Sequence, residues 1–246
     1  MSRAIVLLSG GMDSLVTAAI AIRDNDTVCF LHVNYGQRTE SKELECFQNL
    51  CNFYKPEKSL VIKMDWLGQI GGSALTDTKI EIKDHPNGNV PYSSEWKDNF
   101  SAESTFCSTQ QEIPQTYVPF RNANLISAAV AWAEVVQADS IYIGAVEEDS
   151  SGYPDCRNVF FQSMQKTIET GTLNTKSLNI ITPVIDLKKH QIVRLGKELN
   201  VPFEYSWSCY KNNLIACGVC DSCYLRLRAF DQAGVCDPIP YERKLS

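Results

Sequence analysis

Residues 4–14 read Ala-Ile-Val-Leu-Leu-Ser-Gly-Gly-Met-Asp-Ser, and a mostly apolar stretch follows up to Arg23. Ala4 to Leu8 predict a buried parallel strand, because the run is continuously apolar and stops at a turn. Asp13 to Arg23 predict a helix with apolar residues available for one face. Paired glycines allow positive φ and close approach of a ligand, and the start of a helix offers N–H groups to an anion. The stretch therefore predicts a phosphate-binding turn between a strand and a helix.

The alternation of strand and helix continues along the chain. Further strands are predicted at residues 27–33, 59–64, 140–145 and 179–181, and further helices at 39–54, 122–137, 159–170 and 187–199. This order is typical of an α/β fold with a doubly wound, mostly parallel sheet. Residues 68–115 lack periodic apolar positions, and we interpret them as a long excursion with little regular structure. We expect an α/β domain over residues 1–200 and a small C-terminal region over 201–246.

The composition of the chain argues against some classes of protein. Its 246 residues are 44% hydrophobic, enough for a buried core, and carry a formal net charge of -6. An acidic chain gains little from attraction to phosphates, so we do not expect a nucleic-acid partner. We see no basic leader with an apolar core and no apolar run of membrane length, so we expect a cytoplasmic protein without a membrane span. The sequence does not decide whether the chain forms a homodimer.

Four of the ten cysteines fall in one short segment, with the spacing Cys-x7-Cys-x2-Cys-x2-Cys at Cys209, Cys217, Cys220 and Cys223. Four thiolates close a tetrahedral zinc site with no open position, which makes such a site structural. They also suit an iron–sulfur cluster, and the spacing alone does not decide between the two. Four free buried cysteines are the third interpretation, which the compact spacing disfavours.

The hexapeptide from Ser9 to Ser14 resembles the Ser-Gly-Gly-x-Asp-Ser signature of the PP-loop ATP pyrophosphatase superfamily. A bare Gly-Gly turn would indicate only a tight connection, but this one follows the first strand of an α/β chain. The resemblance implies that ATP is cleaved between its α- and β-phosphates, that AMP is transferred to a substrate oxygen, and that Mg²⁺ assists. It implies ATP contacts from Leu8, Ser9, Gly10, Gly11, Met12, Asp13 and Ser14.

Three more segments narrow the resemblance: Tyr35 to Arg38, Val118 to Asn122, and Ser151 to Arg157. With the loop and the cysteines they resemble the 7-cyano-7-deazaguanine synthase family, from Ile5 to about Phe230. The resemblance implies that ATP adenylates the carboxylate of 7-carboxy-7-deazaguanine and that ammonia displaces AMP to give an amide. A second activation, of the amide oxygen, would then leave the nitrile. The resemblance also implies zinc on the four cysteines.

The same resemblance assigns roles to single residues. ATP contacts extend to Arg121 and Asn122, which otherwise would only begin a helix. Catalytic roles fall on Asp13, Ser14 and Lys189, although an exposed helix lysine is an equal interpretation of Lys189. The implied substrate contacts are Tyr35, Gln37, Arg38, Asp149, Tyr153, Asp155 and Arg157. The last four of these, taken alone, would indicate an exposed turn with a surface ion pair. A thioester on Cys156 is chemically open, but we expect a small buried residue there, because adenylation already supplies a leaving group.

Three features depart from the family pattern. Phe120 stands where many members have glycine, the segment from Thr76 to Val118 is longer than usual, and seven rather than eight residues separate Cys209 from Cys217. The first two could change which amine enters, so an amide ligase that joins the same acid to a protein or other amine is the alternative function. A tRNA-thiolating enzyme would add an RNA-binding domain and basic surface, and a zinc-knuckle binding module would not need the phosphate loop.

Overall fold

The structure is a computed structural model that describes residues 1–86, 113–147, 152–173 and 177–242. Its strands are β1 (Arg3–Leu7), β2 (Thr27–Asn34), β3 (Lys58–Lys63), β4 (Ser140–Ile143) and β5 (Asn179–Ile181). Its α-helices are α1 (Met12–Asp24), α2 (Glu40–Tyr54), α3 (Asp65–Ile70), α4 (Arg121–Val136), α5 (Asn158–Gly171), α6 (Lys189–Glu198) and α7 (Asp221–Ala233). Short 3-10 turns cover Pro154–Cys156 and Phe203–Tyr205.

The five strands form one parallel sheet in the order β3-β2-β1-β4-β5. β1 pairs with β2 on one side and with β4 on the other, so Leu7 lies level with both Leu31 and Ile143. The direction of winding reverses between β1 and β4, and open α/β sheets bind ligands outside the carboxyl ends of their strands at such a point. The predicted doubly wound parallel sheet is confirmed.

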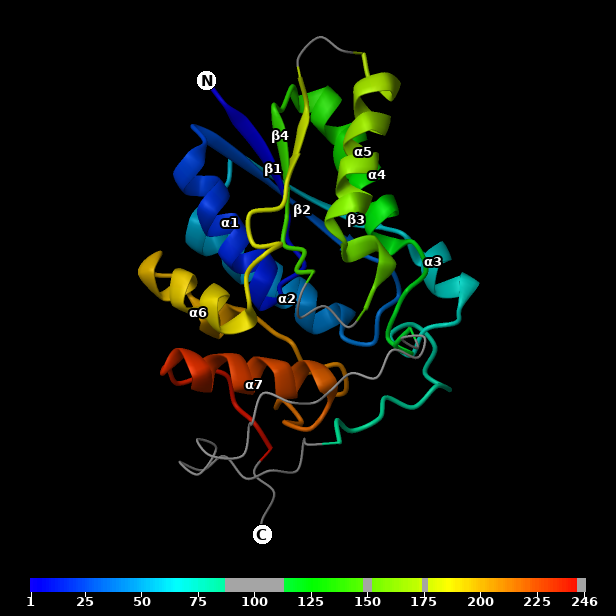
Figure 1. Cartoon of the computed structure of the whole chain (residues 1–246), viewed down its shortest axis with the longest axis vertical. Helices are drawn as coiled ribbons and strands as arrows, with labels where there is room; N and C mark the ends of the chain where they lie inside the picture. The colour runs from blue at the N-terminus through cyan, green and yellow to red at the C-terminus, as the bar shows by residue number, and fades with distance from the viewer. Residues whose placement is uncertain (87–112, 148–151, 174–176, 243–246) are drawn as a thin grey trace.

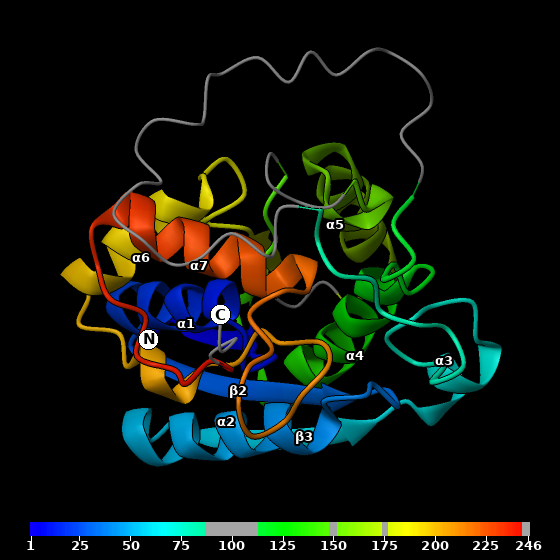
Figure 2. The same ribbon diagram turned by 90° about the horizontal axis from the view of Figure 1, so that it is seen from below.

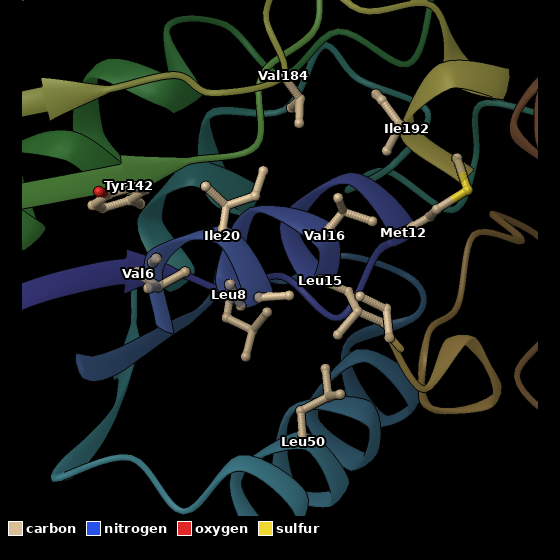
Figure 3. Close-up of a cluster of buried hydrophobic side chains, with 14 of the residues drawn as sticks. Val6, Leu8, Met12, Leu15, Val16, Ile20, Leu50, Tyr142, Val184 and Ile192 are labelled. Atoms are coloured by element: carbon tan, nitrogen blue, oxygen red, sulfur yellow. The ribbon is translucent and has the colours of Figure 1, made fainter. Parts of the chain in front are cut away.

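Side chains of β1 alternate between two buried layers. Ala4, Val6 and Leu8 pack with α1, α2, α6 and α7, whereas Ile5 and Leu7 pack with α4 and α5. Figure 1 shows α1 and the α4–α5 pair on opposite sides of the sheet, and Figure 3 shows the cluster on the α1 side. Because helices cover both faces, the central strand is apolar from Ala4 to Leu7 and shows no polar alternation there.

The α-helices α3 and α7 were not predicted from the sequence, whereas the strands and the other α-helices begin and end within two residues of their predicted bounds. α3 ends at Ile70, so residues 68–70, at the start of the predicted excursion, are helical. α7 begins directly after Cys220 and packs beside α6 (Figures 1 and 2). Its residues Ala229 and Phe230 join the core that surrounds α1. The division of the chain at residue 200 stays a prediction.

The first part of the predicted excursion lies against the cysteine segment. The backbone N–H of His85 donates to the carbonyl of Val219 at 2.8 Å, and the His85 ring stacks on Tyr224 with centroids 3.8 Å apart. Lys211 also pairs with Asp84 at 2.6 Å. The rest of the excursion, residues 87–112, falls outside the described residues. Among the helices of the described ranges, none is both long and apolar enough to cross a membrane.

Candidate active site and metal centre

A cavity of about 290 Å³ lies beside the phosphate loop, at the carboxyl ends of β1, β2 and β4. This is the point where the winding of the sheet reverses, and side chains from the starts of α2, α4, α6 and α7 complete the wall. The predicted residues on that wall are Leu8, Ser9, Gly11, Met12, Asp13, Ser14, Tyr35, Gln37, Arg121, Asn122, Tyr153, Lys189 and Cys209. The fold therefore brings most of the predicted site together, while the role of each residue stays a prediction.

The phosphate loop is held by its own serines. The Ser14 hydroxyl donates to the Gly11 carbonyl at 2.9 Å and lies 3.0 Å from the Ser9 hydroxyl, which accepts from the Gly11 N–H at 3.2 Å. Gly10 has φ of +87°, and a Cβ there would lie 3.0 Å from the backbone oxygen of Glu43, so a glycine is needed. Gly11 caps α1 without a side-chain bond, which leaves the N–H groups of the first turn to a ligand.

Asp13, in the phosphate loop, forms an ion pair with Lys189, which is far from it in the sequence. The Lys189 Nζ, on the first residue of α6, lies 2.5 Å from Asp13 Oδ2. The other carboxylate oxygen, Oδ1, is buried and has no hydrogen-bond partner among the described residues. A buried carboxylate oxygen without a partner requires an explanation, and beside a phosphate loop it suits an oxygen-seeking divalent cation such as Mg²⁺.

Arg121, the first residue of α4, also lines the cavity. Its Nη1 donates to the Tyr35 hydroxyl at 2.8 Å, and its guanidinium lies over the Tyr35 ring, 5.4 Å from the centroid. Burial raises the pKa of that hydroxyl to about 12, so Tyr35 is neutral and does not balance the charge. Since no carboxylate among the described residues pairs with Arg121, the site suits an anionic ligand such as a phosphate or a carboxylate.

Glu43, in the first turns of α2, was not singled out in the sequence, yet it lines the same cavity. The Thr39 hydroxyl donates to Oε1 at 2.7 Å, and the Gln37 amide donates to Oε2 at 3.0 Å. Burial raises the pKa of the Glu43 carboxyl, and these two hydrogen bonds act against the rise. The sequence did contain a signal for Glu43, because it lies just after the Tyr35–Arg38 segment. The start of a helix that follows a strand lies at the carboxyl end of that strand, which is the edge of the sheet where the cavity is.

Two predicted substrate contacts point elsewhere. Arg38 Nη2 donates to the carbonyls of Asp77, at 2.7 Å, and Ile80, so it braces the chain that follows α3. Arg157 is exposed and donates from Nε to the Pro154 carbonyl at 3.1 Å. Neither lines the cavity. Asp149, a third predicted contact, lies outside the described residues.

Asp155 and Cys156 are joined to the start of α4 by Asn122. Asp155 Oδ2 accepts the backbone N–H of Asn122 at 2.9 Å, and the Asn122 side chain donates to the Asp155 carbonyl at 2.8 Å and to Cys156 Sγ at 3.3 Å. Asp155 therefore caps a helix and does not line the cavity, although its neighbour Cys156 does. Burial raises the pKa of the Cys156 thiol to about 11, which keeps it a poor nucleophile near neutrality.

The four clustered cysteines converge beside the cavity, and Cys209 is part of its wall. All four are buried, and their sulfur atoms lie within 4.8 Å of one another. Cys217 and Cys223 Sγ are 3.9 Å apart, close to the roughly 3.8 Å edge of a tetrahedron with zinc–sulfur bonds of about 2.3 Å. Backbone N–H groups of Lys211, Asn212 and Cys217 donate to Cys209 Sγ, an arrangement that stabilises a thiolate. The donor set therefore fits a closed metal site.

Backbone contacts tie this metal centre to the phosphate loop. The N–H of Trp207, two residues before Cys209, donates to the Gly10 carbonyl at 2.8 Å. Arg226 of α7, which is also on the cavity wall, forms a buried pair with Asp237 at 2.7 Å. A phosphate loop at a reversal of sheet winding, a cavity with cationic side chains and an adjoining four-thiol centre define a PP-loop ATP-using enzyme with a metal-binding cysteine cluster.

Comparison with known proteins narrows this class. Residues 3–234 match the family described as "Queuosine biosynthesis protein QueC", and the chain belongs to that family. It is 53% identical over 240 residues to the 7-cyano-7-deazaguanine synthase of Chloroherpeton thalassium, covering 98% of this chain and 97% of the relative. The synthase of Chlorobium chlorochromatii is 51% identical over 242 residues, with 98% and 97% covered. Among solved structures, an NMN synthetase from Francisella tularensis aligns with 16% identity and a TM-score of 0.44, over 96% of this chain and 73% of that one.

Proposed function

We propose that the chain converts 7-carboxy-7-deazaguanine and ammonia into 7-cyano-7-deazaguanine at the expense of ATP. One observation carries the proposal. The phosphate loop and Arg121 line the same cavity, in a chain whose relatives are 7-cyano-7-deazaguanine synthases. The loop would hold the phosphates of ATP, and Arg121 would hold an anionic group of the acid or of its adenylate. Both reactants would then share one enclosed space, which favours their reaction.

The chemistry proceeds in two activations. A carboxylate oxygen attacks the α-phosphorus of ATP, and the bond to the β-phosphate oxygen breaks to release pyrophosphate. Ammonia then attacks the acyl carbon, loses a proton and expels AMP, which gives the amide. The amide oxygen attacks a second ATP in the same way and releases a second pyrophosphate, and loss of AMP and of both protons of the amide nitrogen leaves the nitrile. Each oxygen of the acid thus departs in an AMP.

Residues at the phosphate loop would stabilise the departing pyrophosphate. The N–H groups at the start of α1, the hydroxyls of Ser9 and Ser14 and the ammonium of Lys189 line the cavity, and they would surround the phosphates on which negative charge develops. Mg²⁺, if held by Asp13, would add Lewis-acid stabilisation of the phosphates. Zinc on the four cysteines is proposed as structural, because four thiolates leave no position for a substrate.

Mass spectrometry of products from ATP, ammonium and the acid tests the proposal. We expect the nitrile with two AMP per molecule, and we expect the amide to be converted without added ammonium. At limiting ammonium the rate should rise with pH, because only unprotonated ammonia attacks, until groups of the enzyme titrate. An inert amide together with rapid acylation of a protein amine would replace the synthase by the amide ligase.

A further inference from the structure

The cavity contains a carboxylate to which the sequence analysis assigned no role and which the proposed chemistry does not use. Among the described residues, Asp13, Glu43 and Asp221 are the acids on the wall. Asp13 pairs with Lys189 at the phosphate loop, and Asp221 is exposed at the start of α7. Glu43 lies apart from both, near Tyr35 and Arg121, and none of the described cations forms an ion pair with it.

Neighbouring groups fix the orientation of the Glu43 carboxylate. The Gln37 side-chain oxygen accepts the Tyr35 backbone N–H at 2.8 Å, so its amide nitrogen must be the atom that faces Glu43 Oε2. This bond removes the usual ambiguity of an amide flip. Thr39 holds the other oxygen at 2.7 Å. Each oxygen therefore has one donor from the protein, while a carboxylate offers about four acceptor sites, so each retains capacity toward the cavity.

Two parallel acceptors match one edge of the proposed substrate. A guanine-like ring carries N1–H and the 2-amino group side by side, and a carboxylate accepts from both at once, as it does from the fork of an arginine. Adenine lacks this pair of adjacent donors, because its N1 is an acceptor. Tyr35, Tyr153 and Tyr210 supply aromatic wall for a flat ring, and Arg121 supplies a cation for the substrate's carboxylate.

We propose that Glu43 is the specificity-determining residue that reads the N1–H and 2-amino edge of the deazaguanine acid, with Gln37 and Thr39 as its positioning residues. This inference rests on the proposed function. Asp155, which was one of the predicted substrate contacts, instead caps α4 through the backbone N–H of Asn122.

Steady-state kinetics with two acids test this assignment: 7-carboxy-7-deazaguanine and its analogue without the 2-amino group. Wild-type protein should prefer the first by about 100-fold or more in kcat/KM, because a site built for a substrate N–H rejects an analogue without it. Glu43→Gln places a donor against a donor, so kcat/KM for the natural acid should fall by about 100-fold and the preference should shrink. The KM for ATP should not change.

The matched control is Glu45→Gln, on the same helix but exposed and paired with Lys42. This control should change neither kcat/KM for the natural acid nor the preference between the two acids. If Glu43→Gln does not fold, as judged by circular dichroism, Glu43→Asp replaces it, since the shorter side chain withdraws the carboxylate and should also reduce the preference. An unchanged preference in the folded variant, or a raised KM for ATP with unchanged use of the acid, overturns the assignment. Absence of any amide or nitrile from wild-type protein would instead contradict the proposed function.

Discussion

Gly144 shows how closely the phosphate loop is fitted to the sheet. It follows β4, and a Cβ built on it would lie 2.7 Å from the backbone nitrogen of Ser14 and 2.8 Å from the carbonyl carbon of Asp13. These are backbone atoms at the start of α1, which cannot move aside as a flexible side chain does. The glycine is therefore required by close packing, and its φ is not in the left-handed region.

Gly144→Ala should displace the phosphate loop and raise the KM for ATP, with a loss of about 1–3 kcal/mol in stability from overpacking. Gly171→Ala is the control, because nothing lies within 4 Å of a Cβ at that last residue of α5. It should be neutral or slightly stabilising. ATP kinetics and thermal melts of the two variants check this, and equal behaviour of the pair would contradict the packing argument.

Cys156 provides a second prediction for a single residue. With a pKa of about 11, nearly all of the thiol is protonated at neutral pH, so we expect no acyl-enzyme on it. Cys156→Ser keeps an acceptor for the Asn122 amide and should change kcat little. Intact-protein mass spectrometry during turnover should show no adduct. A covalent adduct that disappears in the serine variant would restore the thioester route.

Phe120 stands at a position with φ of +55°, immediately before α4. A glycine there would adopt this conformation without strain, whereas a residue with Cβ does so at a cost of roughly 1–2 kcal/mol. Phe120 is thus a point of local strain at the start of a helix. The side chain itself is exposed and lies edge-on to Phe160.

At the scale of elements, the starts of α1 and α6 converge on the same end of the sheet. Lys189 gains nothing from its own helix, because a cation at a helix N-terminus opposes the helix dipole. Its partner is Asp13, at the start of α1. The placement of a lysine there is explained by the site rather than by the stability of α6.

Lys189→Met should lower kcat by about 100-fold, in line with the loss of one charge-stabilising donor at the reacting phosphate. Lys197→Met, at the exposed end of the same helix, is the control and should retain activity. Measured AMP release in both variants checks the prediction. If Lys189→Met merely raised the KM for the acid, the proposed role of Lys189 at the reacting phosphate would be wrong.

At the scale of the whole molecule, the four-cysteine cluster joins distant parts of the chain. Cys220 caps α7 and Cys223 lies within it, while Ala229 and Phe230 of that helix pack against α1. The segment before Cys209 contacts Gly10, and residues 84–85 contact the cysteine segment. Loss of the metal should therefore loosen both the core beside α1 and the wall of the cavity.

Purified protein should carry about one zinc per chain, the stoichiometry of one closed four-thiolate site. Cys220→Ser should lose the metal and melt at a markedly lower temperature, because the binding energy of a structural zinc is also folding energy. Cys236→Ser, at an exposed free cysteine, should do neither. Elemental analysis measures the metal content of each variant, and melting curves measure its stability. A coloured preparation with iron and no zinc would establish the iron–sulfur alternative.

Local signals in the sequence were sufficient for the strand-turn-helix around Ser9 to Ser14, for the α/β order and for the cysteine cluster. Periodicity and spacing act over a few residues, so these features can be read without the fold. Only the tertiary structure decided which side chains share the cavity. The pairing of Asp13 with Lys189, the need for Gly144 and the exposure of Glu43 to the cavity join residues far apart in the chain. The directions of Arg38, Asp155 and Arg157 were likewise set by nearby backbone partners, whose positions no spacing rule encodes.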